Sequence, residues 1–321
     1  MSTTLAPHSP AAKLRRVEDE VRKVLVGQQV LMDRLLVALL ARGHVLIEGV
    51  PGLAKTLTVK TLARALHLDF RRVQFTPDLL PADLVGTLIY DQRSGAFTPR
   101  RGPVFTHILL ADEINRAPAK VQSALLECME ERQVTLGDAT HSLAEPFMVL
   151  ATQNPLEQEG TYPLAEAQVD RFLMKLVLDY PSREEESQIL DRMLVEQPAE
   201  VEAVLDVEAL LKLRQAADSI YLAPALRGYI LDLVGESRES EDESLRRWIA
   251  VGASPRATLY LARSAKAHAL LAGRNHALPE DVKAIAPEVL RHRLMPSFEA
   301  EAEGIDGDYL VNRILDRVDV P

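Results

Sequence analysis

The chain of 321 residues is 47% hydrophobic and 26% charged, which is typical of a folded globular protein and excludes a disordered or collagen-like chain. No apolar run approaches the roughly 20 residues that cross a bilayer, and residues 1–12 lack the cationic and apolar regions of a signal peptide, so we expect a cytoplasmic protein without membrane insertion. A net charge of −10 disfavours a stable complex with nucleic acid, and the single cysteine, Cys128, excludes an intrachain disulfide.

Helical periodicity begins after residues 1–12, which we expect to form a flexible tail. Apolar spacing predicts helices over residues 14–24 and 30–40, and a short apolar run at 44–48 predicts a buried strand. Helical segments at 56–66 and 120–130 then alternate with further apolar runs, at residues 72–75, 108–111, 147–151 and 172–178. This alternation predicts an α/β core over residues 13–181, with a doubly wound, mostly parallel sheet.

Two further segments of the core have the alternation and the central turn of a β-hairpin. The first covers residues 87–104, with its turn at Gly95, and the second covers residues 133–143, with its turn at Gly137. We expect both to be inserts in the α/β core.

The pattern changes after Pro181. Helical periodicity recurs to the end of the chain, over residues 183–196, 207–217, 223–236, 255–272 and 279–290. Since no strand alternation follows Leu178, we predict an all-α domain over residues 182–321, with the acidic run 236–243 as a solvated loop.

A glycine-rich segment joins the first strand to the next helix, with the sequence Gly49-Val50-Pro51-Gly52-Leu53-Ala54-Lys55-Thr56-Leu57. Backbone N–H groups at such a junction can bind phosphate, Lys55 can reach the β and γ oxygens, and the Thr56 hydroxyl can coordinate Mg²⁺. Ala54 stands where glycine normally precedes the lysine, which is tolerable if the backbone there stays in a helical region. The alternative is an ordinary Gly/Pro turn.

Two adjacent acids, Asp112 and Glu113, end the apolar run 108–111. After a phosphate loop, this pattern predicts that Asp112 lies near Mg²⁺, in direct contact or through water, and that Glu113 polarises the attacking water. The alternative is a strand that ends in a charged turn.

Together these motifs resemble the AAA+ superfamily, and its MoxR branch in particular. The resemblance rests on the phosphate loop and on Asp112-Glu113-Ile114-Asn115-Arg116-Ala117-Pro118, and it extends from about Leu14 to the last helices. The phosphate loop of that family commonly carries alanine before lysine. The resemblance implies an ATPase core followed by an all-α lid, with ATP and Mg²⁺ in the cleft between them.

The same resemblance assigns roles to residues outside the two motifs. Asn154, in Asn154-Pro155, is implied as the first sensor beside the γ-phosphate, or else belongs to a simple Asn-Pro turn. Arg171 is implied as an arginine finger that enters a neighbouring subunit's site, or else pairs with Asp170 or Glu166.

Two further segments are implied to contact the nucleotide. Arg256, near the start of a predicted lid helix, matches the second sensor, or else is a surface cation. Gly27 and Gln28 resemble the segment that brackets the adenine base, although Gly-Gln also forms ordinary helix junctions.

The implied function is ATP hydrolysis that drives chaperone-like remodelling or maturation of protein complexes by a homo-oligomer, in this superfamily most often a hexameric ring. A von Willebrand factor A domain protein is the expected partner, together with protein clients. The nearest alternative is a chelatase-type motor subunit. An enhancer-binding transcription regulator or a nucleic-acid translocase is an alternative from a different functional class. The segment Gly95-Ala96-Phe97-Thr98 is similar to the loop with which such activators engage a sigma factor, but Pro99 and Arg100 stand where that loop ends in Gly-Ala.

Overall fold

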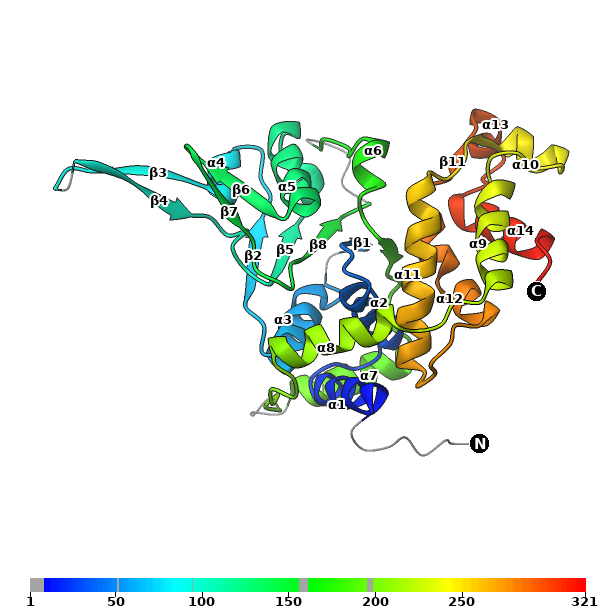
Figure 1. The fold of residues 1–321 in the computed structure, drawn as a ribbon, viewed down its shortest axis with the longest axis horizontal. Helices are drawn as coiled ribbons and strands as arrows, with labels where there is room; N and C mark the ends of the chain where they lie inside the picture. Colours follow the sequence, from blue (N-terminus) through cyan, green and yellow to red (C-terminus); the bar gives the residue numbers. More distant parts are fainter. Residues whose placement is uncertain (1–8, 51, 94, 156–160, 195–198) are drawn as a thin grey trace.

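The computed structural model describes residues 9–50, 52–93, 95–155, 161–194 and 199–321 (Figure 1). Its centre is a five-stranded sheet in the order β2-β5-β8-β1-β9, and every neighbouring pair is parallel. The strands are β1 (Val45–Glu48), β2 (Phe70–Gln74), β5 (Ile108–Asp112), β8 (Met148–Gln153) and β9 (Met174–Val177). The predicted parallel α/β core is thus confirmed.

Successive residues of the central strands belong to two separate hydrophobic clusters. In β5, for example, Ile108 and Leu110 pack into the first cluster, whereas Leu109 and Ala111 pack into the second. This alternation arises because neighbouring side chains of a strand point to opposite faces. Both faces of the sheet are therefore buried.

Helices of the core divide between these two clusters. The first cluster takes its helical residues from α1 (Pro10–Arg22), α2 (Gln29–Leu40) and α3 (Lys55–Ala65). The second takes them from α4 (Pro81–Val85) and α5 (Ala119–Glu131). The helix α1 begins inside the predicted tail, because the Ser9 side chain caps it by accepting a hydrogen bond from the Ala12 backbone.

Both predicted hairpins are present. One joins β3 (Gly86–Asp91) to β4 (Ala96–Arg101), and the other joins β6 (Gln133–Leu136) to β7 (Ala139–Ser142). The β3–β4 hairpin extends away from the sheet, at the left of Figure 1. Short helical segments, η1 (Ile114–Arg116) and α6 (Glu166–Val169), follow β5 and β8.

The C-terminal part is mainly helical, as predicted. Its helices are α7 (Arg183–Met193), α8 (Val207–Asp218), α9 (Pro224–Glu236), α10 (Glu243–Trp248), α11 (Pro255–Leu271), α12 (Pro279–Leu290), α13 (Phe298–Ala302) and α14 (Gly307–Arg317). The prediction that this part lacks strands is wrong, because β10 (Ile249–Val251) pairs antiparallel with β11 (Met295–Pro296). Strands of three and two residues are too short to show alternation.

The two parts of the chain share one hydrophobic cluster, which joins α1, α2 and α3 to α8, α9, α10, α11, α12 and α14. The helix α8 contacts both α2 and α11. The boundary near Pro181 stays a prediction. None of the helices in the described ranges is long and apolar enough to span a membrane.

Candidate functional site

The glycine-rich segment lies between β1 and α3, at the carboxyl edge of the sheet. Lys55 is the first residue of α3, and its Nζ donates a 2.6 Å hydrogen bond to the Gly49 carbonyl oxygen. Burial lowers the pKa of the Lys55 ammonium, against the opposing effect of Asp112 and Glu113. Pro51 lies outside the described residues. The lysine is thus held at the mouth of the loop, within the field of both acids.

Ala54 adopts a left-handed conformation, with φ of +54° and ψ of 20°. The expectation that a methyl group is tolerated here assumed ordinary helical backbone, so the position carries more strain than the sequence suggested. A left-handed conformation costs an L-residue about 1 kcal/mol, which glycine avoids. The usual glycine at this position therefore has a backbone reason.

Asp112 ends β5 between residues of the two flanking strands. Its Oδ1 accepts a 2.5 Å hydrogen bond from the Thr152 hydroxyl on β8, and its Oδ2 lies 2.6 Å from Nη2 of Arg72 on β2. The sequence pattern identified neither partner, because strand order is not visible in local periodicity. The Asp112 carboxylate and the Thr56 hydroxyl are hard oxygen donors, which suit Mg²⁺ bound jointly with phosphate.

Glu113 follows β5 in a left-handed conformation, with φ of +57°. Its Oε2 accepts a 2.7 Å hydrogen bond from Nε2 of Gln74 and lies 3.2 Å from Nε of Arg116. A non-glycine residue at positive φ stores strain of the kind found at functional sites. Two neighbouring side chains thus hold the carboxylate that the sequence predicts as the catalytic base.

Asn154 directly follows β8, the strand between β5 and β1, and it is buried. Its position brings it to the edge of the sheet where the glycine-rich segment and the Asp112–Glu113 pair also lie. All three predicted elements of the phosphate site therefore share one edge, as expected for parallel strands that bind ligands at their carboxyl ends.

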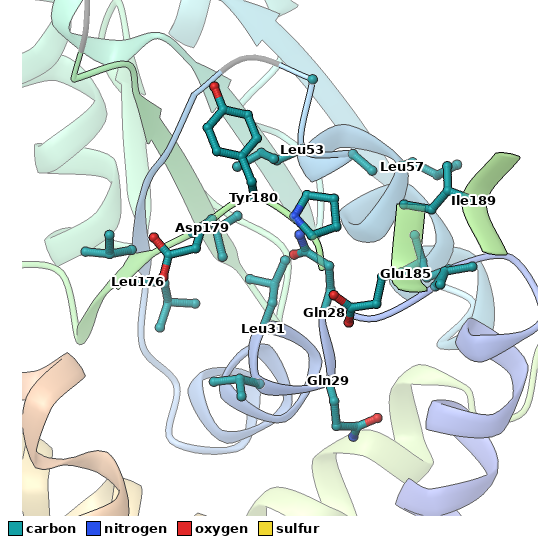
Figure 2. A pocket seen from close by; sticks show the side chains of 18 of the residues that line it. Gln28, Gln29, Leu31, Leu53, Leu57, Leu176, Asp179, Tyr180, Glu185 and Ile189 are labelled. Carbon is teal, nitrogen blue, oxygen red and sulfur yellow. The ribbon is translucent and has the colours of Figure 1, made fainter. Parts of the chain in front are cut away.

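A cavity of about 610 Å³ lies beside the glycine-rich segment (Figure 2). Predicted residues that line it are Gln28, Gly52, Leu53, Ala54 and Leu57. Apolar side chains that the sequence did not single out complete the wall, among them Leu31, Leu176, Tyr180 and Ile189. Glu288 of α12 and Arg291, the residue that directly follows this helix, also line the cavity. The wall is thus mostly apolar with a few polar groups, as in binding sites for small molecules.

Gly27 is adjacent to this cavity. Its φ is +65°, and a Cβ atom on it would lie 2.2 Å from Oε1 of Glu185. The left-handed conformation favours glycine at this position, whereas Glu185 approaches with the flexible end of its side chain and could move aside.

Arg171 and Arg256 meet at one carboxylate rather than at this cavity. Nε of Arg171 lies 3.1 Å from Oε2 of Glu130, and Nη2 of Arg256 donates a 2.8 Å hydrogen bond to Oε1 of the same residue. The two arginines line a second cavity of about 220 Å³ together with Arg42, Arg132 and Arg263. Arg171 thus forms an ion pair within its own chain, as the alternative predicted, but its partner is Glu130, while Asp170 pairs with Arg293 at 2.8 Å.

Comparisons with known proteins agree with this site. Residues 44–174 match the family described as "ATPase family associated with various cellular activities (AAA)", and residues 245–314 match the AAA lid domain. The chain is 48% identical over 311 residues to "Chaperone MoxR1" of Mycobacterium tuberculosis, covering 96% of this chain and 82% of that protein. It is 33% identical over 327 residues to "Protein MoxR" of Methylorubrum extorquens, covering 95% and 94%. A crystal structure described as that of a candidate ATPase from Cytophaga hutchinsonii aligns with a TM-score of 0.92 at 49% identity, covering 97% of this chain and 96% of that one.

Proposed function

Since the chain belongs to the MoxR family of AAA+ ATPases, we propose that it binds ATP with the base in the larger cavity and the phosphates at residues 49–57, and hydrolyses it with Mg²⁺. One observation supports this most directly: the glycine-rich loop and the Asp112–Glu113 pair lie at one edge of the sheet, beside a cavity of about 610 Å³. Cavities of this size are suited to a ligand as large as a nucleotide.

Each residue has a distinct task in this mechanism. Lys55 exchanges its hydrogen bond with the Gly49 carbonyl for the β and γ oxygens, which stabilises their charge. Thr56 and Asp112 would hold Mg²⁺, which would neutralise part of the phosphate charge. Glu113 accepts a proton from water, or orients it, once its carboxylate leaves Gln74 and Arg116. Asn154 helps to position that water.

Arg171 and Arg256 act together on the nucleotide of a neighbouring subunit. Both side chains are about one-third exposed, and Glu130 holds them side by side, away from the cavity of their own chain. Two guanidinium groups in this arrangement can stabilise charge on a transferring phosphoryl group. This proposal assigns Arg256 to a neighbour's site, whereas the sequence suggested a sensor within its own subunit. It requires a homo-oligomer, for which a hexameric ring is the expected form.

Two substitutions test the ATPase proposal. Lys55→Ala should lower ATP affinity at least tenfold in calorimetry, whereas Lys60→Ala, on the exposed side of the same helix, should not. Glu113→Gln should bind ATP but lose turnover, because an amide cannot accept the proton. Unchanged affinity in the first variant or substantial turnover in the second would contradict the proposal.

The ATPase cycle drives chaperone-like remodelling or maturation of protein complexes, and a von Willebrand factor A domain protein is the proposed partner. The relative named "Chaperone MoxR1" supports this role. A chelatase-type motor is the alternative of similar mechanism. Capture of partners by the Glu113→Gln variant with ATP, followed by mass spectrometry, tests the role. Strong stimulation of ATPase activity by nucleic acid would instead support a translocase.

A further inference from the structure

The backbone around Arg171 is bound by side chains of the lid. Residues 170–173 lie between α6 and β9, inside the range that matches the AAA family. The Arg293 guanidinium donates to three of their four carbonyl oxygens, at 2.8, 2.5 and 3.3 Å, namely those of Asp170, Phe172 and Leu173. The Tyr260 hydroxyl donates to the fourth, that of Arg171, at 3.3 Å. Both donors lie in the range that matches the lid domain.

Arg293 is a buried residue, only 6% exposed. Its Nε donates a 2.8 Å hydrogen bond to Oδ1 of Asp170. Burial lowers the pKa of the Arg293 guanidinium to about 10, and the Asp170 carboxylate opposes this effect. A buried guanidinium requires a paired anion and acceptors for its N–H groups. Since residues 170–173 supply both, Arg293 forms a fixed connection between the lid and the core.

The Asp170 carboxylate also binds the start of α11. The Ser254 hydroxyl donates to Oδ2 of Asp170 at 3.0 Å and to Oδ1 at 3.1 Å. The same hydroxyl oxygen caps α11 by accepting a 3.2 Å hydrogen bond from the Arg256 backbone N–H. Asp170 directly precedes Arg171 in the chain. Two hydrogen bonds through Ser254 therefore set the spacing between the backbones of Arg171 and Arg256.

The guanidinium ends of these two arginines are held less firmly. Glu130, which pairs with both of them, has a side chain that is 41% exposed. An ion pair at such a position is weak, because water screens it and both side chains lose conformational freedom. The buried contacts of Asp170 and Arg293, rather than Glu130, therefore determine where the two arginines stand relative to each other.

We propose that Asp170 and Arg293 are positioning residues for ATP hydrolysis, which join the lid to the core so that Arg171 and Arg256 reach a neighbouring subunit's nucleotide as one unit. This inference rests on the proposed action of both arginines on that nucleotide. A small displacement of a charge-stabilising group is enough to lower a reaction rate strongly. We call Asp170, Ser254, Tyr260 and Arg293 the latch.

Loosening the latch should lower turnover and leave ATP affinity unchanged, because none of the described residues that line the larger cavity belongs to it. Tyr260→Phe removes the hydroxyl that binds the Arg171 carbonyl, and turnover should fall about threefold to tenfold, the scale of one hydrogen bond. Asp170→Asn removes the charge that pairs with Arg293, and turnover should fall at least tenfold. Steady-state ATPase measurements and calorimetry with ATP test both variants.

Tyr229→Phe is the matched control for Tyr260→Phe. Tyr229 lies on the lid helix α9, and within the described structure its buried hydroxyl has no hydrogen-bond partner. Removing this hydroxyl should leave turnover at the wild-type value. The comparison separates loss of the contact with Arg171 from the general effect of removing a tyrosine hydroxyl in the lid.

Mixing experiments separate positioning from structural damage. Either latch variant should recover activity when mixed with Glu113→Gln, because that variant presents ordered arginines to the intact ATP site of the latch variant. Neither should recover when mixed with Arg171→Ala, since no subunit in that mixture presents a competent pair of arginines. A latch variant that is inactive through damage to its own ATP site would not recover in either mixture.

The possible failures are distinguishable. Wild-type turnover in Tyr260→Phe, or no recovery of the latch variants with Glu113→Gln, would overturn the role of the latch. If Asp170→Asn does not fold, Tyr260→Phe and its control still decide. Full turnover in Arg171→Ala would instead contradict the proposed action of the arginines on a neighbour's nucleotide, and a wild-type chain that does not hydrolyse ATP would contradict the proposed function itself.

Discussion

Nε2 of Gln74 donates a 2.7 Å hydrogen bond to Oε2 of Glu113, between the ends of the neighbouring strands β2 and β5. Arg116 lies 3.2 Å from the same oxygen. Both contacts occupy lone pairs of the carboxylate oxygen that a water molecule would otherwise use. Gln74 therefore competes with water for the carboxylate to which we assign proton abstraction.

This competition predicts the effect of Gln74→Ala. Without the amide donor, Glu113 should reach water more easily, and turnover at saturating ATP should rise between about twofold and tenfold, within the energy of one hydrogen bond to a charged group. ATP affinity should stay unchanged. Steady-state ATPase measurements test this, with Arg71→Ala on the same strand as the control. A fall in turnover would mean that Gln74 positions Glu113 for catalysis instead.

The shared carboxylate of Glu130 predicts that Arg171 and Arg256 act on the same neighbouring site. Arg171→Ala and Arg256→Ala should each lose most ATPase activity. Each should recover part of it when mixed with Glu113→Gln, because that variant still offers both arginines to a competent neighbour. Activity across mixing ratios measures this recovery. If Arg171→Ala recovers and Arg256→Ala does not, Arg256 acts within its own subunit.

The positive φ of Ala54 predicts an unusual response to glycine. Glycine adopts the left-handed conformation without strain, which stabilises the folded state, but it also makes the unfolded chain more flexible, which stabilises the unfolded state. These two effects oppose each other, so Ala54→Gly should change the free energy of unfolding by less than about 1 kcal/mol. ATP affinity should be retained. The control Ala124→Gly, in the middle of α5, should cost about 1 kcal/mol. Denaturant unfolding measures both variants, and an equal loss in the free energy of unfolding for Ala54→Gly and Ala124→Gly would contradict backbone strain at Ala54.

Asp281 predicts a pH-dependent contribution to stability. Burial alone would raise its pKa, but hydrogen bonds from His268 and Arg274 outweigh this and lower it to about 2. A depressed pKa stabilises the fold above the unfolded value of 3.8, and this stabilisation is lost as pH falls towards 2. Asp281→Asn should therefore cost about 2 kcal/mol at pH 7 and about half of that at pH 3. Urea unfolding at both values tests this; an equal cost at both would contradict it.

Much of the fold was predictable because periodicity and turn chemistry act over a few residues. The strands β1, β5 and β8, the helices α2, α3 and α5, and both hairpins lie close to their predicted positions. The two-stranded pairing of β10 with β11 was not predictable, because segments of two and three residues carry no pattern. Likewise, α1 begins at Pro10, inside the segment expected to be a tail, because Ser9 caps the helix.

The sequence by itself determined which residue types could carry ATP chemistry, because the loop around Lys55 and the acids Asp112 and Glu113 form short contiguous motifs. Only the tertiary structure decided which distant side chains join them. Strand order brings Gln74 to Glu113, and helix packing brings Arg256 to the carboxylate of Glu130 rather than to the larger cavity. These pairings join residues 39 and 126 positions apart, a range over which packing of the whole chain, and no local pattern, sets the neighbours.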